Sequence, residues 1–484
     1  MPPPTGRGKH MDTALNLIKG SWREVHGDFV DDVFDPATGE VIAKLPYSQP
    51  GDVDEAIMAS ALALNDWSHL PSDERLEVLR RLRSLVKDQT AELASLIVQE
   101  NGKTIGEAED ELAQALQVID FACEGGAGLA DPAAEGASGD QSVRTPAGVC
   151  AGISYYNFPL VSVLWMVAPA LACGNTFVLR PCTYSPLTGT RVAALLGDAG
   201  LPAGVLNVVH GAIEVVDQIL ADDRVTALSY VGSGPWAHYM YRVGAAAGKR
   251  IQSLGAIRSA IVVAEDADLD SAVQAIRSSA YAMAGQRWLG GTIAIPVGSI
   301  AEPLVSALVD AARRLDVGPG SDPATLMGPI IRADRRQNAV NLIGRAASNG
   351  TTMPLDGRAM SEDGGYFLGP TIIDKVSANH ELLDEEFFGP ICAVCRVPDL
   401  GQAVRIVNAQ GRHGVASIFT GSADSARTFS EEADAALVGV NWIPRPIDFM
   451  PQASVPSYYG DLSMSGDDIF RFYTRRKAIT SQRT

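Results

Sequence analysis

The strongest constraint on the fold is an alternation of short apolar runs with helix-length periodic segments, which begins at Gly148. The apolar runs read as five buried strands: GVCAGIS, TFVLRP, VLNVVHG, VTALSYVG and RIQSL. Helical periodicity separates them, for example over 187–199 and 215–221. Strands joined by helices lie parallel, so this series predicts an α/β fold with a parallel sheet covered by helices on both faces. A second series, AIVVA, TIAIPV, PTIID, ICAVCRV and SIFTG, begins near Ala260 and predicts a second α/β domain.

The segments outside these two series are helical, flexible or edge-like. From Asp54 to Gln99, apolar residues recur every three or four positions, which predicts two amphipathic helices. The stretch 125–139, GGAGLADPAAEGASG, is typical of a linker or of the approach to an exposed arm. Residues 1–10 are rich in Pro and Gly, as in a mobile tail. The C-terminal stretch FYTRRKAITSQ alternates well enough for a strand that pairs with a neighbouring subunit's sheet edge.

The charge balance excludes several classes of partner. The chain has 484 residues, with 39 Lys and Arg against 57 Asp and Glu, a formal net charge of −18. A nucleic-acid backbone or an anionic membrane requires a basic stripe, which this acidic sequence does not contain. The longest apolar run, 161–174, includes Pro169 and is shorter than the ~20 residues that cross a membrane. We therefore expect a soluble, cytoplasmic protein that acts on small molecules.

The cysteines do not suggest a disulfide framework or a metal site. There are six of them, at positions 123, 150, 173, 182, 392 and 395, and the sequence has no Cys/His cluster with zinc spacing. We therefore predict no bound metal. Cys392 and Cys395 form a CxxC pair, which leaves a redox or metal role as a minor alternative.

A candidate phosphate-binding turn, YVGSGPWAHYMY, follows one predicted strand and opens a helix. Gly232, Ser233 and Gly234 leave the backbone accessible to a pyrophosphate at the helix N-terminus, and Trp236 could cover an adenine. The usual GxGxxG spacing is missing, so a simple tight turn into a helix is an equal alternative.

Five blocks together resemble the aldehyde dehydrogenase superfamily, and within it the methylmalonate-semialdehyde dehydrogenase branch: ISYYNFPLVSVLWMVAPALACGNTFVLRP, YVGSGPWAHYM, AMAGQRW, EEFFGP and FYTRRKAITSQ. The resemblance covers nearly the whole chain. It implies an aldehyde dehydrogenase-like fold with a Rossmann-type nucleotide-binding domain at 12–127 and 146–254, an α/β catalytic domain at 255–440, and a β oligomerisation arm at 128–145 and 455–484. It also implies a small-molecule substrate and a homodimer or homotetramer.

The resemblance implies roles for residues at matching positions. Asn157 matches the amide of an oxyanion hole, which stabilises negative charge on a carbonyl oxygen, and a helix-capping Asn is the alternative. Glu386 and Phe388 match the pair that holds the nicotinamide ribose and ring. The other expected cofactor contacts are Ser154, Gly211, Ser233 and Trp236.

Two positions bear on the choice of cofactor. Arg180 stands where the family has a Lys near the adenosine ribose, and Thr183 stands where NAD-preferring members have a Glu. A Glu accepts from the ribose 2′-hydroxyl and repels a 2′-phosphate, whereas a Thr beside a guanidinium tolerates that phosphate. We therefore expect NADP(H) to be favoured over NAD(H).

The nucleophile of the family is missing. Aldehyde oxidation in this family begins with attack by a thiolate, but its GQRC block is here Gly285, Gln286, Arg287 and Trp288. An indole is not a nucleophile under these conditions. Cys150 and Cys182 belong to the nucleotide-binding strands and Cys173 matches a core position, so we expect none of the cysteines to replace the missing thiol.

The predicted substrate contacts differ as well. Ser253 stands where many members have a general-base Glu, although the semialdehyde branch also lacks that Glu. The branch binds its substrate carboxylate with an Arg on a helix, and Gln114 occupies that position here while Arg287 remains. Ala113 replaces a usual aromatic residue, so the substrate site around Trp288 is expected to be reshaped.

Three functions remain compatible with these departures. The favoured one is NADP(H)-dependent hydride transfer to a carbonyl or an imine without a covalent thioester, with Trp288 stacking on a planar or cationic substrate and Tyr155 or Tyr156 donating a proton. The second is a catalytically inactive homologue with a structural or regulatory role. The third is a non-redox lyase or cyclase that uses the same site.

Overall fold

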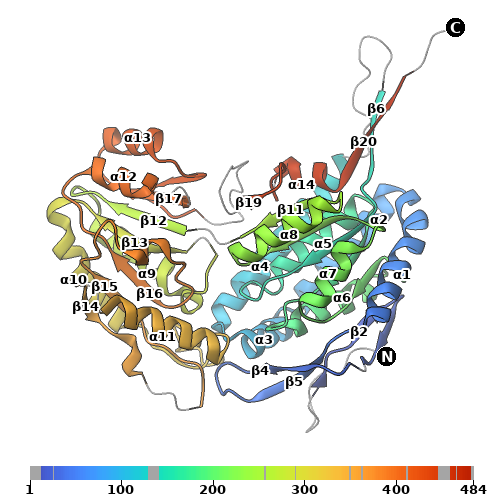
Figure 1. The fold of residues 1–484 in the computed structure, drawn as a ribbon, viewed down its shortest axis with the longest axis horizontal. Coiled ribbons are helices and arrows are strands. Elements are labelled where there is room, and N and C mark those ends of the chain that lie inside the picture. Colours follow the sequence, from blue (N-terminus) through green and yellow to red (C-terminus); the bar gives the residue numbers. More distant parts are fainter. Residues whose placement is uncertain are drawn as a thin grey trace.

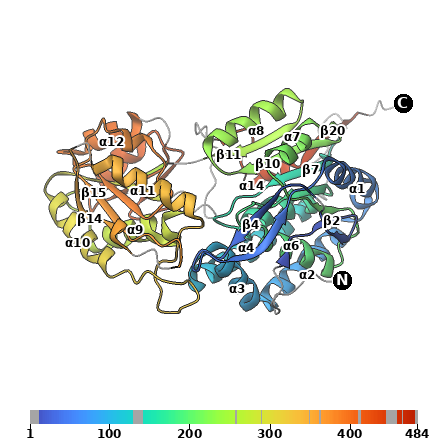
Figure 2. The same ribbon diagram turned by 60° about the horizontal axis from the view of Figure 1, so that its bottom comes forward.

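The computed structural model describes residues 12–25, 27–128, 141–255, 258–288, 290–347, 350–360, 364–409, 413–444, 458–464 and 466–480. Two α/β units lie beside each other, and a two-stranded ribbon projects from one of them (Figures 1 and 2). The predicted N-terminal tail and most of the predicted linker lie outside the described residues.

The first unit is built on an eight-stranded sheet with the strand order β19-β11-β10-β7-β8-β9-β2-β3. Its strands are β2 (Asn16–Ile18), β3 (Ser21–Arg23), β7 (Val149–Ile153), β8 (Thr176–Arg180), β9 (Leu206–Val208), β10 (Val225–Val231), β11 (Arg250–Leu254) and β19 (Tyr458–Tyr459). The five central strands are parallel and lie within the five predicted apolar runs. The helices that alternate with them are α5 (Val161–Ala172), α6 (Pro186–Asp198), α7 (Ile213–Ala221) and α8 (Gly234–Ala246).

The second unit is built on a seven-stranded sheet with the order β14-β15-β16-β13-β12-β17-β18. Its strands are β12 (Arg258–Val263), β13 (Gly291–Pro296), β14 (Thr352–Leu355), β15 (Thr371–Asp374), β16 (Ile391–Val394), β17 (His413–Phe419) and β18 (Leu437–Val440). Only β14 runs antiparallel among the described strands of this sheet. Its helices are α9 (Leu269–Tyr281), α10 (Ala301–Arg313), α11 (Ala333–Ala347), α12 (Leu400–Ala409) and α13 (Ala423–Glu432), with short 3-10 turns η1 (Ala282–Gly285), η2 (Gly298–Ile300), η3 (Gly357–Ala359) and η4 (Glu381–Asp384).

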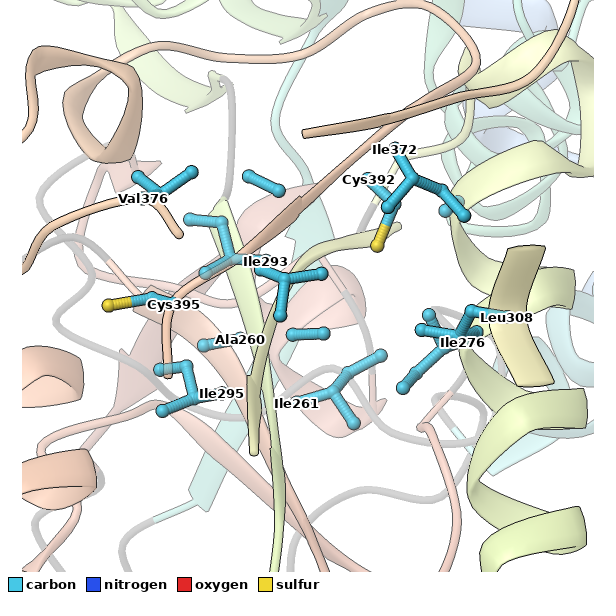
Figure 3. Packing of buried hydrophobic residues seen from close by; sticks show 14 of the residues in the cluster. Ala260, Ile261, Ile276, Ile293, Ile295, Leu308, Ile372, Val376, Cys392 and Cys395 are labelled. Atoms are coloured by element: carbon cyan, nitrogen blue, oxygen red, sulfur yellow. The ribbon is translucent and has the colours of Figure 1, made fainter. Parts of the chain in front are cut away.

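The CxxC pair lies in the apolar core of this second unit. Cys392 and Cys395 are both almost fully buried, and their sulfur atoms point away from each other (Figure 3). Burial raises the pKa of Cys392 to about 12 and that of Cys395 to about 11, so both are neutral thiols at pH 7. Their environment is that of core residues.

The N-terminal region differs from its sequence-based prediction. It forms a small sheet of β1 (Asp12–Thr13), β4 (Val30–Phe34) and β5 (Val41–Pro46), followed by α1 (Pro50–His69), α2 (Ser72–Asp88), α3 (Thr90–Asn101) and α4 (Ile105–Gly128). The two helices predicted between Asp54 and Gln99 are therefore wrong in number, because breaks after His69 and at Gln89 divide this region into three.

The predicted linker starts too early, because α4 continues through Gly128. A Cβ on Gly125 would lie 2.0 Å from the ring of Phe470, and one on Gly126 would lie 2.9 Å from Ala172. These glycines therefore permit close packing of α4 against its neighbours, which overrides their low helix propensity.

The projecting ribbon consists of β6 (Gln141–Pro146) and β20 (Thr474–Ile479), paired antiparallel from Thr474 opposite Pro146 to Ile479 opposite Gln141. After its first residue, β20 is exposed. Two other elements of the predicted arm join the first unit instead: β19 pairs with β11, and α14 (Gly466–Phe472) packs on α4 and α5. The division into three domains at the stated residue bounds remains a prediction. Within the described ranges, no helix is long and apolar enough to span a membrane.

Candidate functional site

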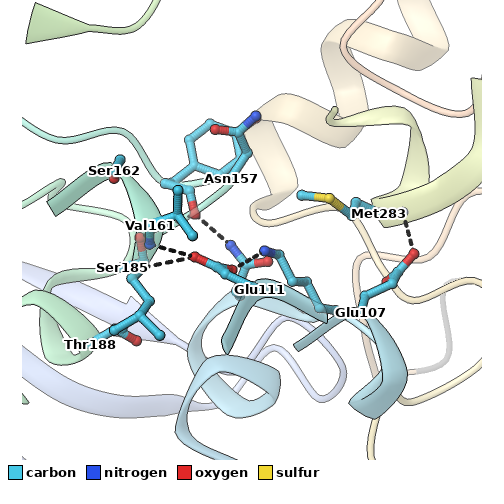
Figure 4. Close-up of polar contacts among 12 residues, drawn as sticks. Glu107, Glu111, Asn157, Val161, Ser162, Ser185, Thr188 and Met283 are labelled. Atoms are coloured by element: carbon cyan, nitrogen blue, oxygen red, sulfur yellow. Dashed lines mark hydrogen bonds and ion pairs between the residues drawn. The ribbon is translucent and has the colours of Figure 1, made fainter. Parts of the chain in front are cut away.

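The junction between α3 and α4 holds the loop that carries the predicted oxyanion-hole residue. The side-chain amide of Asn101 donates to the carbonyl of Tyr156 over 2.7 Å. Glu111 of α4 accepts from the backbone N–H groups of Leu160 and Val161, at 2.8 and 3.0 Å (Figure 4). A carboxylate at this position satisfies unpaired donors and interacts favourably with the dipole of α5. Hydrogen bonds from the α3–α4 junction therefore fix both ends of the loop that carries Asn157.

The same junction contains a buried ion pair. The Lys103 ammonium contacts the Glu111 carboxylate, and both side chains are about 1% exposed or less. Lys103 also lies 4.5 Å from the centre of the Phe158 ring. If either partner of such a buried pair loses its charge, the other charge is left buried without compensation and the folded protein is strongly destabilised. Lys103 and Glu111 therefore act as a unit.

A second buried carboxylate, Glu100, caps α6. It accepts from the backbone N–H groups of Leu187 and Thr188, at 2.8 and 2.7 Å, and from the Thr188 hydroxyl. Burial raises the pKa of Glu100 to about 7, although these hydrogen bonds act in the opposite direction. The two helices that follow β7 and β8 thus both begin on buried acidic groups of α3 or α4.

The loop that leads to Trp288 has an unusual backbone. Met283, Ala284 and Gly285 have φ values of 57°, 53° and 70°, a left-handed region that non-glycine residues seldom adopt. The N–H of Met283 donates to Glu107 of α4 over 2.6 Å, and the other carboxylate oxygen of Glu107 accepts from Thr104 N at 3.0 Å. Glu107 therefore ties this strained turn of the second unit to the first.

Asn157 and the Trp288 segment meet directly. The side-chain amide of Asn157 donates to the carbonyl of Gln286 over 2.9 Å, and Asn157 is only 4% exposed. Gln286 in turn accepts from Ile331 N at 3.1 Å. The alternative in which Asn157 caps the following helix is wrong, because Glu111 fills that role. Asn157 thus contacts the residue two positions before Trp288, where the resemblance implies a nucleophile.

Trp288 bridges the two units. Trp288 lies between η1 and β13 of the second unit, yet it packs against the apolar core of the first unit. Its indole Nε1 is buried and has no hydrogen-bond partner among the described residues. A half-buried aromatic ring therefore fills the position expected to hold a small thiol.

The free thiols offer no evident substitute. All six cysteines lie within the described ranges and are unpaired. Burial raises the pKa of Cys173 to about 12 and also raises the pKa of Cys150 and Cys182. A thiol with a raised pKa is almost entirely protonated at pH 7 and is a poor nucleophile.

The other predicted substrate contacts are distributed differently. Ser253 is fully buried, and its hydroxyl donates to the carbonyl of Ala237 in α8 over 2.9 Å, which fits a packing role. Gln114 lies half-buried on α4, and Arg287 is half-buried next to Trp288. Arg287 and Trp288 thus lie in the same segment before β13, whereas Ser253 contacts α8.

Four aromatic rings pack beside Asn157. Tyr155 and Tyr156 have ring centres 4.6 Å apart, and Phe388 lies 6.0 and 5.9 Å from them. Tyr184 lies 5.7 Å from Tyr156. Burial raises the pKa of both Tyr155 and Tyr156, and the Glu386 carboxylate adds to this effect. Raised values make both phenols weaker acids, which disfavours their predicted role as proton donors.

The predicted adenosine-side residues come together at the ends of β7 and β8. Arg180 donates from Nε to the carbonyl of Gly211 over 2.8 Å. Ser154 accepts from Cys182 N at 3.0 Å, and its own N–H donates to Arg180 O. Thr183 is half-buried three residues beyond Arg180. This edge of the sheet is where parallel α/β sheets bind ligands.

The N-terminus of α8 has the features of an anion-binding turn. Ser233 is its N-cap residue, and the Ser233 side chain itself makes no capping hydrogen bond to the helix. Gly232 leaves room for Tyr230, whose hydroxyl would lie 2.1 Å from a Cβ at that position. Trp236 is 45% exposed and packs edge-on against Tyr239. The N-terminus of a helix suits a phosphate, and the exposed indole of Trp236 suits an adenine.

Glu107 and Glu111 were not singled out from the sequence. Their spacing of four residues on one helix places both on the same face, which is the signal that would have found them. The groups that Glu107 and Glu111 contact, in segments far away in the sequence, are seen only in the tertiary structure. No group of three His, Cys, Asp or Glu side chains suited to a metal ion occurs in the part of the chain that is described.

Comparison with known proteins identifies a family and a fold. A family model described as the aldehyde dehydrogenase family matches residues 22–479. The malonate-semialdehyde dehydrogenase 2 of Geobacillus thermodenitrificans is 40% identical, over 97% of this chain and 99% of that protein. The crystal structure of methylmalonate-semialdehyde dehydrogenase from Oceanimonas doudoroffii has a TM-score of 0.94 at 35% identity, covering 98% of both chains. A putative methylmalonate-semialdehyde dehydrogenase from Sinorhizobium meliloti, complexed with NAD, has the same TM-score at 33% identity and covers 99% of both.

Proposed function

This chain belongs to the aldehyde dehydrogenase family, and we propose that it transfers hydride between NADP(H) and a small carbonyl or imine compound without a covalent enzyme intermediate. The observation that carries the proposal is the contact between Asn157 and Gln286, two residues before Trp288. This contact supports a role for Asn157 in stabilising charge on a substrate oxygen, while Trp288 stands where the resemblance implies the thiol that would attack the carbonyl carbon. Hydride transfer requires positioning and charge stabilisation but no nucleophile.

Asn157 is the group that would contact the reacting bond. Its amide has two N–H donors, and the Gln286 carbonyl uses one of them at 2.9 Å. The second can donate to a substrate oxygen on which negative charge develops. The contact with Gln286 also orients the amide, which lowers the cost of reorganisation during the reaction.

Trp288 favours a cationic acceptor. The face of an indole ring attracts a cation, and an iminium carbon accepts hydride without needing a proton from the protein. This matters because burial raises the pKa of Tyr155 and Tyr156 and makes them poor acids at pH 7. Among the acceptors considered, a small iminium therefore agrees best with the side chains present.

The residues that would hold the cofactor are compatible with a dinucleotide. The N-terminus of α8 at Ser233 can receive a pyrophosphate, and Arg180 lies at the adenosine side beside Gly211. A bound nicotinamide would supply or accept the hydride. Thr183 in place of an acidic residue is the basis for proposing that NADP(H) is preferred.

The proposal is tested by two measurements on the purified full-length chain. We expect micromolar binding of NADPH by isothermal titration calorimetry, tighter than that of NADH, and consumption of NADPH with a small cyclic iminium. With a small aldehyde as acceptor, Asn157→Ala should lower kcat by about 100-fold with little effect on NADPH affinity, because the amide donates to an oxygen on which negative charge develops. Absence of NADPH and NADH binding at micromolar concentrations would overturn the proposal.

A second candidate is a catalytically silent member of the family. It is favoured by the packing of Trp288 against the core of the first unit, which is also what a purely structural residue would do. Tight nucleotide binding together with no turnover of carbonyl or iminium compounds would support this candidate over hydride transfer.

A further inference from the structure

Two arginines that the site residues do not include pack on Tyr184. The guanidinium carbon of Arg332 lies 4.7 Å from the centre of the Tyr184 ring and 5.6 Å from that of Phe34. The guanidinium carbon of Arg335 lies 5.5 Å from the Tyr184 ring, and its Nη2 donates to the Tyr184 hydroxyl over 3.2 Å. Guanidinium groups stacked on aromatic rings are held in place while their N–H edges remain free to bind other groups.

The carboxylates that pair with these two arginines lie farther from them than in a short charge-assisted hydrogen bond. Arg332 lies 3.4 Å from Asp31 and 3.4 Å from Asp334, and Nε of Arg335 lies 3.8 Å from Asp334. Charge-assisted hydrogen bonds normally span about 2.7–2.9 Å. Nε of Arg335 is also buried without a hydrogen-bond partner in the described ranges.

Other arginines of this protein show what close pairing looks like here. Arg224 contacts Asp222 at 2.5 Å, Arg396 contacts Asp374 at 2.5 Å, and Arg358 contacts Asp356 at 2.6 Å. Exposed Arg80 and Arg81 pair with Glu77 at 3.4 and 3.3 Å, so the feature that distinguishes Arg335 is its buried Nε without a hydrogen-bond partner in the described ranges. Two guanidinium groups held on the same aromatic ring, one of them with an Nε that has no hydrogen-bond partner among the described residues, form a surface suited to an anion.

The position of these arginines relates them to the dinucleotide residues. Tyr184 directly follows Thr183, and the phenols of Tyr47 and Tyr184 act on the pKa of Arg180. On the other side, Tyr184 packs on Tyr156, which packs on Phe388. Arg332 and Arg335 thus lie between the adenosine-side and nicotinamide-side residues.

We propose that Arg335, supported by Arg332, binds a phosphate group of the dinucleotide. The inference rests on the proposed function, which names the cofactor but not these residues. The planar N–H edge of a guanidinium matches two phosphate oxygens, and the half-exposed Arg335 side chain, 40% accessible, can be reached by a ligand. The phosphate is either the 2′-phosphate of NADP(H) or the pyrophosphate that all nicotinamide dinucleotides share.

The test compares Arg335→Met with the parent protein by titration calorimetry, using NADPH, NADH, ADP and adenosine 2′,5′-bisphosphate. We expect Arg335→Met to weaken NADPH binding at least 10-fold and Arg335→Lys to weaken it less. Arg313→Met, at an exposed arginine in α10, is the matched control and should bind NADPH like the parent. Melting temperature without ligand reports whether each variant is folded.

The outcomes separate the two phosphate sources and the two levels of proposal. Weakening of NADPH and adenosine 2′,5′-bisphosphate alone assigns the 2′-phosphate, and equal weakening of NADPH, NADH and ADP, the three ligands that contain a pyrophosphate, assigns the pyrophosphate. A folded Arg335→Met or Arg335→Lys variant that binds NADPH as tightly as the parent overturns this inference and leaves the proposed function standing. A parent protein that binds none of the four overturns both.

Discussion

At the scale of single residues, the proposed reaction depends most on Trp288 and Tyr155. Trp288 is not a nucleophile and offers a flat aromatic surface that belongs to one unit and packs on the other. Tyr155 lies next to Glu386 and Phe388 but is held in its neutral form by burial, which raises its pKa. The two residues favour a reaction that needs neither a thiolate nor a tyrosine acid.

Replacement of Trp288 should affect both stability and activity. We expect Trp288→Ala to lower the free energy of unfolding by about 2–3 kcal/mol, because a half-buried ring leaves a void, and Trp288→Phe by about 1 kcal/mol. Iminium reduction should fall at least 10-fold in Trp288→Ala and less in Trp288→Phe. Urea unfolding and kcat/KM measure the two effects, and a fully active Trp288→Ala would argue against stacking of the substrate.

Replacement of Tyr155 tests the proton source. Because its raised pKa keeps the phenol protonated throughout pH 6–9, Tyr155→Phe should leave the shape of the kcat/KM profile unchanged over that range. A loss of 100-fold or more together with the disappearance of a titration in this range would instead identify Tyr155 as the acid. Tyr239→Phe, at a phenol of α8 that donates to Asp217, is the control for loss of a phenol.

At the scale of elements, the start of α4 organises the site. Glu111 caps α5, Glu107 holds the turn before Trp288, and Asn101 at the end of α3 holds the Tyr156 carbonyl. One helix junction therefore positions segments that are more than 100 residues apart.

The ion pair in this junction should show strong coupling. Glu111→Gln keeps an acceptor for α5 but leaves the Lys103 ammonium buried without a counter-charge, which should cost about 3–5 kcal/mol of unfolding free energy. Lys103→Met combined with Glu111→Gln should restore most of that loss. A double variant as unstable as the sum of the single variants, measured by urea unfolding, would contradict the pairing.

The attachment of β2 to the sheet should depend on pH through His210. The His210 ring lies 3.1 Å from the carbonyl of Leu15, just before β2, and burial lowers its pKa from 6.5 to about 4. The folded state therefore binds this proton less readily than the unfolded state, so its contribution is full above pH 6.5 and is lost as the pH falls toward 4. About 2 kcal/mol should be lost between pH 8 and pH 5.

His210→Gln should remove this component of the pH dependence, while the exposed His238→Gln should retain it. The difference between parent and variant is the useful quantity, because Glu100, whose pKa is raised to about 7, has the opposite sign and loses stability as the pH rises. Identical curves for parent and His210→Gln in urea titrations at pH 5 and 8 would contradict the assignment.

At the scale of the whole molecule, the ribbon of β6 and β20 projects away from the two units. Among the described strands, β20 pairs only with β6, and most of it is exposed. Such an unpaired edge commonly joins a sheet of another subunit.

A chain that ends after Thr474 should remain folded but form a smaller oligomer, because Thr474 keeps its contacts to Phe470 and Arg250 while the edge is removed. Lys477→Pro, which removes a donor within the ribbon opposite Val143, should act in the same direction. Light scattering after size exclusion measures the mass. An unchanged mass in both variants would exclude the ribbon from assembly.

Much of the architecture could be predicted from the sequence because it depends on local pattern. The apolar runs of β7, β8, β9, β10 and β11 are buried on both faces and therefore stand out from their helical neighbours. The three-helix division before Asn101 and the extension of α4 through Gly125 could not be predicted the same way. Local propensity does not record that Phe470, more than 300 residues away, packs on that glycine.

The sequence by itself determined the α/β class, the membership of a family and the absence of a thiol at Trp288, because these depend on residue identity and order. Only the tertiary structure decided that Asn157 contacts Gln286, that Trp288 packs across the two units, and that Arg332 and Arg335 meet on Tyr184. Contacts between distant segments depend on how helices and strands pack in three dimensions. No pattern of neighbouring residues encodes the distances on which the chemistry of the site depends.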